Sequence, residues 1–124
     1  MARRSMIAAL ILVGLGGLAC TNSVAIPQAT TRDGGELFTQ EGCSGCHIDG
    51  GGRIAPSLVG VFGEMVRLEN GDTVIADSEY IRESILSPHA MIVAGYDSIM
   101  PAYSGKLTEE QLVSLVEHIR SLAD

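Results

Sequence analysis

Five consecutive residues restrict the fold of this chain more than any other part of its sequence: Cys43-Ser44-Gly45-Cys46-His47. On one turn of helix, residues three apart share a face, so both thiols point the same way. The two residues between them are small, which lets the backbone lie close to a flat partner. Cys-x-x-Cys-His is the attachment signature of haem c, with the histidine as proximal iron ligand. We therefore predict one covalently attached haem c.

Paired cysteines also occur in two other kinds of site. A thioredoxin-like redox pair is expected beside a strand-helix-strand pattern, and none surrounds Cys43 and Cys46. A zinc site combining them with His89 and His118 is formally possible, but the regular spacing of a second ligand pair is missing. The sequence therefore favours the haem site over both.

A haem that transfers electrons usually takes a second axial ligand, a histidine or a methionine, from a distant part of the chain. The candidates are Met65, Met91, Met100, His89 and His118. Met100 lies in a loop rich in glycine and small residues just before the last expected helix, and Pro101 fixes the backbone beside it. Met91 lies in an apolar run where a core role is typical, and Met65 lies beside a probable strand. We predict that Met100 is the second axial ligand.

The N-terminus is typical of an export signal. Arg3 and Arg4 precede an uncharged apolar run over residues 6–19. As a helix this run would span about 21 Å, short of a membrane core of about 30 Å. We therefore expect residues 1–19 to be a secretory signal, with a short, tilted membrane anchor as the alternative.

The chain contains three cysteines, and the haem motif uses only two of them. Leu18-Ala19-Cys20 resembles a bacterial lipoprotein cleavage site, although Gly17 stands where that pattern prefers leucine. A competing cleavage site follows residues 23–25, which have the small-x-small form. Because Cys20 would otherwise be a free thiol in an oxidising compartment, we predict that it is lipidated.

Residues 20–32 are small and polar and contain a proline, so they are expected to tether the anchor to a domain over residues 33–124. The chain has no Trp, two Phe and three Tyr, which is a thin aromatic supply for a core. A domain this small often needs a stabilising group in addition to its hydrophobic core. A covalent haem would provide a large apolar group for the core to pack around.

The net charge is −7, and loss of two arginines with the signal would leave about −9. This net negative charge argues against nucleic acid and against anionic lipid headgroups as partners. It permits a partner with a basic docking surface, although a solvated acidic surface explains it equally well.

Three helices are expected in the domain. The first covers about 33–40, with Asp33 as its N-cap. The second covers about 78–86; Asp77 or the serine after it caps this helix, and Pro88 stops it.

The third helix and a hairpin have the clearest local patterns. Thr108 to Gln111 form a capping box. One buried helical face then follows, made of Leu112, Leu115, Val116, Ile119 and Leu122. Alternating apolar residues at 66–69 and 73–76 surround Asn70-Gly71-Asp72, which predicts a β-hairpin. The expected fold is mainly α, with a short hairpin.

Over about residues 35–122 the chain resembles class I cytochromes c. In that family a glycine and an aromatic residue of the first helix pack on the last helix, and Gly35 and Phe38 match those places. His118 stands where the last helix usually has an aromatic residue. The loop after the haem motif has Pro56, whose carbonyl would hold the proton of the His47 imidazole.

The resemblance is closer to the cytochrome c domain of subunit II in caa3-type haem-copper oxidases. It rests on the segments GCSGCH, APSLVGVFG, VRLENGDTVIAD, SILSP and IVAGYDSIMPAYSGKLTEEQ. That subunit also has a copper-binding domain and two membrane spans, which the 124 residues of this sequence do not supply. The chain thus resembles the cytochrome module standing alone on a signal or lipid anchor.

This resemblance implies a class I cytochrome c fold, with three or more helices around one haem. Arg53, Tyr96 and Tyr103 are candidate hydrogen-bond partners of a haem propionate, although surface or core roles suit each equally. With both axial positions filled, the chain is expected to carry one electron at a time and to bind no small-molecule substrate.

The expected setting is the periplasm or the outer face of the cytoplasmic membrane. Redox partners there would be a terminal oxidase, a reductase or a quinol-oxidising complex. Two alternatives are a fixed cytochrome subunit of such a complex and a haem enzyme or sensor with an open sixth position.

Overall fold

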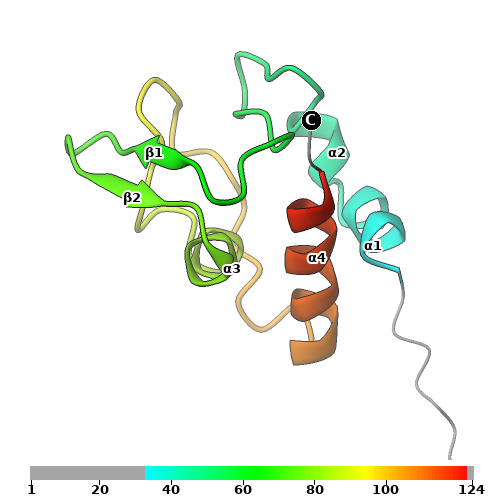
Figure 1. Cartoon of the computed structure of the whole chain (residues 1–124). Coiled ribbons are helices and arrows are strands. Elements are labelled where there is room, and N and C mark those ends of the chain that lie inside the picture. Colours follow the sequence, from blue (N-terminus) through cyan, green and yellow to red (C-terminus); the bar gives the residue numbers. More distant parts are fainter. Residues whose placement is uncertain (1–32, 123–124) are drawn as a thin grey trace, which may run out of the picture.

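The computed structural model describes residues 33–122, so the predicted signal, Cys20 and most of the tether lie outside the described residues. In the described part the elements are α1 (Gly34–Gln40), α2 (Cys43–Cys46), β1 (Met65–Arg67), β2 (Thr73–Ile75), α3 (Ser78–Leu86) and α4 (Glu109–Ser121). The fold is mainly helical with one small antiparallel sheet, as the sequence predicted (Figure 1). None of these helices is long and apolar enough to cross a membrane.

Helices α1 and α4 pack directly on each other near the two ends of the described chain (Figure 1). Asp33 caps α1 by accepting a hydrogen bond from the Gly35 amide. Gly34 is buried, and a Cβ there would fall on the Ser114 carbonyl oxygen and 2.7 Å from His118 Cβ. The resemblance matched this packing role to Gly35. Gly35 does face His118 of α4, but the closest approach of the two helices occurs at Gly34.

Phe38 completes this helix contact as predicted. Its ring centroid lies 5.2 Å from that of His118, with the two planes tilted by 52°. The imidazole thus takes the place of the usual aromatic residue, and tilted stacking keeps the contact favourable.

The core joins α1, α3 and α4. Its buried members are Leu37, Phe38, Ile81, Ile85, Leu112, Leu115, Val116 and Ile119. The predicted capping box is present, because Thr108 accepts from the Gln111 amide and the Gln111 side chain accepts from the Thr108 amide. Asp77 caps α3 by accepting from the Tyr80 amide, and this helix has the predicted bounds.

An exposed ion pair also links α3 to α4. Both guanidinium nitrogens of Arg82 contact the Glu109 carboxylate, at 2.5 and 2.6 Å. The Arg82 hydrogen bonds hold the pKa of Glu109 below its ordinary value. Because both side chains are exposed, the pair is expected to add little to the stability of the fold.

The predicted hairpin is present, with Val66 paired to Val74 in the antiparallel ladder. At its turn the Asn70 side chain accepts a hydrogen bond from the Asp72 amide, and Gly71 has a φ of 92°. Glycine suits this turn because that backbone conformation costs it no Cβ clash. A β-bridge between Leu68 and Val93 then joins the hairpin to the long loop before α4.

Candidate haem site

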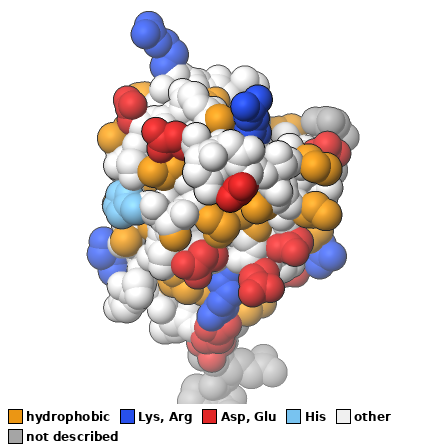
Figure 2. Space-filling view, turned by 90° about the vertical axis from the view of Figure 1, so that its left-hand side faces the viewer, with side chains coloured by type: hydrophobic (Ala, Val, Ile, Leu, Met, Phe, Trp, Pro, Cys, Tyr) orange, Lys and Arg blue, Asp and Glu red, His pale blue; other side chains and the backbone are white. Residues whose placement is uncertain are grey.

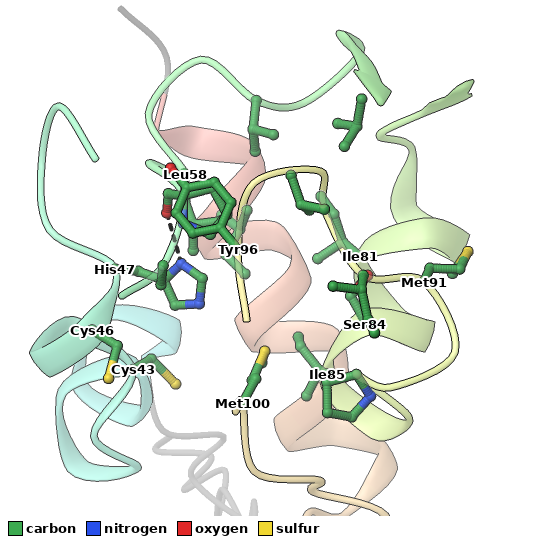
Figure 3. A pocket seen from close by; sticks show the side chains of 18 of the residues that line it. Cys43, Cys46, His47, Leu58, Ile81, Ser84, Ile85, Met91, Tyr96 and Met100 are labelled. Carbon is green, nitrogen blue, oxygen red and sulfur yellow. Dashed lines mark hydrogen bonds between the residues drawn. The ribbon is translucent and has the colours of Figure 1, made fainter. Parts of the chain in front are cut away.

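A cavity of about 720 Å³ lies between α2, the hairpin, α3, α4 and the loop that precedes α4 (Figure 3). Most of its lining is apolar, and its volume falls within the range of roughly 300–1,000 Å³ typical of organic-ligand sites. The residues of the haem motif and Met100 line the same cavity. Segments far apart in the sequence thus meet around one space large enough for an organic cofactor.

Helix α2 is a single turn that presents both cysteines of the motif. Gly42 precedes it with a φ of 82°, a left-handed conformation that lets the chain turn sharply out of α1. Cys43 and Cys46 are free thiols that line the cavity. Burial raises the pKa of the Cys43 thiol above its ordinary value. The predicted placement of two thiols on one helical turn is therefore present.

His47 ends α2 and turns its imidazole into the cavity (Figure 3). Its Nδ1 lies 2.8 Å from the carbonyl oxygen of Pro56. A carbonyl oxygen can only accept, so Nδ1 carries the proton and Nε2 is left with its lone pair. This is the tautomer that an iron ligand needs, and Pro56 orients the ring as predicted.

Met100 is half-buried, and its thioether points into the cavity (Figure 3). The loop that carries it is closed by a 2.7 Å contact between His89 Nδ1 and Ser98 Oγ. The Tyr103 amide donates to the Ile85 carbonyl at 3.2 Å, which fastens the loop to the end of α3. The backbone around Met100 is therefore held at both sides.

The other candidate axial ligands are placed less favourably. Met65 lines the cavity from β1 but has 70% of its surface exposed, whereas His118 is packed against Phe38. His89 is exposed and bonded to Ser98, and Met91 lines the cavity at a place away from His47 (Figure 3). Within residues 33–122, no three His, Cys, Asp or Glu side chains are grouped as a metal site requires, so the zinc alternative gains no support.

The three candidate hydrogen-bond partners of a haem propionate lie in different places relative to the cavity. Arg53 is exposed and is not among the residues that line the cavity. Tyr103 lines it, but its hydroxyl donates to the Glu41 carbonyl at 2.7 Å. Tyr96 also lines the cavity. Arg67, which was not among the residues predicted from the sequence, is exposed but belongs to the lining.

Residues 31–123 match the family model described as Cytochrome c, so the chain belongs to the cytochrome c family. It matches none of the curated proteins with which it was compared. With Cys43, Cys46 and His47 placed as described, the site fits one covalently bound haem c. The haem supplies a one-electron couple between ferrous and ferric iron. The chain is thus an electron-transfer haem protein.

Proposed function

We propose that this protein is a single-haem electron carrier in which His47 and Met100 hold the iron from its two faces. The observation that carries the proposal is the convergence of one imidazole and one thioether on the same cavity (Figure 3). They come from separate walls, α2 and the loop before α4. With both axial positions taken, small molecules have no iron site to enter, which favours electron transfer over substrate chemistry.

Replacing Met100 with alanine tests this proposal. We expect the Met100→Ala variant to lose the ferric absorption features of thioether ligation, to bind carbon monoxide readily when reduced, and to have a lower reduction potential, because methionine ligation raises the potential. Met91→Ala removes a thioether from another part of the lining and should leave all three properties unchanged. An unaltered Met100→Ala spectrum, together with ready carbon monoxide binding by the native protein, would show that the sixth position is open.

The proposed setting is the cell envelope, at the periplasm or the outer face of the cytoplasmic membrane. Three sequence features support it: the apolar leader, the spare Cys20, and the similarity to the cytochrome domain of caa3-type oxidase subunit II. The donors and acceptors would be membrane-bound respiratory complexes, such as a quinol-oxidising complex, a reductase or a terminal oxidase. A tether would raise the effective concentration of such partners around the domain.

The surface charge supports a protein partner over a nucleic acid. Figure 2 shows the hairpin side, where basic side chains stand singly among acidic and apolar ones. Such a surface lacks the clustered cations that phosphate backbones need. A permanent subunit of an oxidase or reductase would share this surface, and co-purification from gently solubilised membranes separates it from a free carrier.

Lipidation makes a separate prediction. We expect Cys20→Ser to move the cytochrome from the membrane fraction to the soluble fraction, because the acyl chains provide the anchor. Intact mass of the native protein should show an acylated N-terminal Cys20. A mature chain that begins after Ala25 would instead identify an ordinary signal peptide, and Ala25→Leu, which blocks only that site, serves as the control.

A further inference from the structure

The attachment of the haem fixes the direction in which its carboxylates lie. A haem carries its two vinyl groups and its two propionates at opposite edges, and the vinyl edge must meet Cys43 and Cys46 on α2. The propionates of a bound haem would therefore lie across the cavity from α2. Figures 1 and 3 both place the hairpin on that opposite side.

One cation lines the cavity on that side. Among the described residues, Arg67 is the only lysine or arginine in the lining. It is the last residue of β1, paired with Thr73, and its guanidinium forms no ion pair within residues 33–122. Glu41 and Asp97 are the carboxylates of the same lining, and neither is paired with it.

The hairpin is fastened to the loop that completes the site. The Ala94 amide donates to the Arg67 carbonyl at 2.9 Å, and the Glu69 amide donates to the Ile92 carbonyl at 2.8 Å. These bonds place the backbone of Arg67 beside the segment that leads to Tyr96, another residue of the lining. The Tyr96 hydroxyl makes no hydrogen bond to any residue in the described range, so its donor is available.

We propose that Arg67 is the ion-pair partner of a haem propionate, with the Tyr96 hydroxyl as a second donor. The hairpin then has a function, which is to hold a cation at the carboxylate edge of the cofactor. Arg53, the arginine that the sequence suggested, lies in the loop after α2 and does not line the cavity. The assignment rests on the covalent haem and is independent of Met100 ligation and of the redox partners.

A cation at this position should raise the reduction potential. Ferrous haem carries one positive charge less than ferric haem, so a nearby guanidinium destabilises the ferric state more. Neutralising a propionate acts in the same direction, because an unpaired carboxylate favours ferric iron. Because Arg67 is exposed, salt screens its charge, so the potentials are compared at low ionic strength.

The test is the midpoint potential of purified holoprotein. We expect Arg67→Gln to shift the ferrous-to-ferric ratio at a fixed potential three- to tenfold toward ferric, which lowers the midpoint by about 28 to 59 mV at 59 mV per tenfold for one electron. Arg67→Lys should restore most of the loss, because it keeps the charge. Arg53→Gln removes the same charge elsewhere and should leave the potential close to that of the native protein.

A second readout reports the carboxylates themselves. In redox-induced infrared difference spectra, Arg67→Gln should shift the carboxylate bands, Tyr96→Phe should shift them less, and Arg53→Gln should not. The absorption spectrum of each variant reports axial ligation separately, so a displaced Met100 is recognised. Equal potentials for Arg67→Gln and Arg53→Gln, or unshifted carboxylate bands in Arg67→Gln, would overturn the assignment.

Discussion

The chain prepared without haem is expected to lose its tertiary packing. The site is a cavity of about 720 Å³ in a domain of which the structure describes residues 33–122. The cavity opens to solvent, so without haem its apolar walls would face water, which is unfavourable by about 25 cal/mol per Å² of exposed apolar surface. Folded proteins are stable by only about 5–15 kcal/mol, so this exposure is large beside the stability of a small domain. We therefore expect the walls to collapse or separate.

The protein without haem can be obtained by expressing the domain in a cell compartment that does not attach haem. We expect reduced helical circular dichroism, binding of hydrophobic dyes and no cooperative thermal transition, which together describe loosened packing. The holoprotein from an exporting strain is the reference. The single variant Cys46→Ser, which keeps one thioether bond, controls for loss of a thiol and should remain folded once loaded. An apoprotein with a sharp thermal transition like that of the holoprotein would contradict the expectation.

Gly34→Ala is expected to destabilise the holoprotein by about 2–3 kcal/mol. The new Cβ would fall on the carbonyl oxygen of Ser114 and 2.7 Å from His118 Cβ. A helix carbonyl cannot swing aside, so α1 and α4 must move apart. The effect should lower the melting temperature by roughly 10–20 °C for a domain of this size. Because α1 leads directly into α2, we also expect a displaced Cys43 and a disturbed haem spectrum.

Gly35→Ala is the matched control. Its added Cβ would lie 3.2 Å from Cε1 of His118, at the far end of a ring that can rotate. Alanine in a helix also gains up to about 1 kcal/mol over glycine, so stability should change by less than about 1 kcal/mol. Thermal unfolding of both variants, followed at the haem absorption, decides between them. Equal losses would mean that both glycines carry the helix contact and that Gly34 has no special role.

The secondary structure could be predicted from local signals. Asp33, Asp77 and Thr108 each precede a helix and each accepts a hydrogen bond from its first turn. The Asn70-Gly71 turn produced the expected hairpin. These elements follow from bonds between residues two to four apart, which the sequence displays directly.

The thiols and the proximal imidazole could be predicted for the same reason, since Cys43, Cys46 and His47 lie on one short segment. The glycine at which α1 contacts α4 could not be predicted from the sequence. Gly34 and Gly35 are equivalent by composition, and only the path of α4 across α1 decides which one lies beneath Ser114. Arg53 and Arg67 differ in the same way, because the lining of the cavity depends on how the hairpin folds back.

The haem-attachment motif, the helix ends and the hairpin could be read from the chain, because each depends on residues that are neighbours in sequence. Which glycine lets two helices touch, and which arginine lines the cavity, depends on the tertiary structure. The tertiary structure also set the direction of the Met100 thioether. Those features depend on segments tens of residues apart, and only packing around a common core brings such segments together.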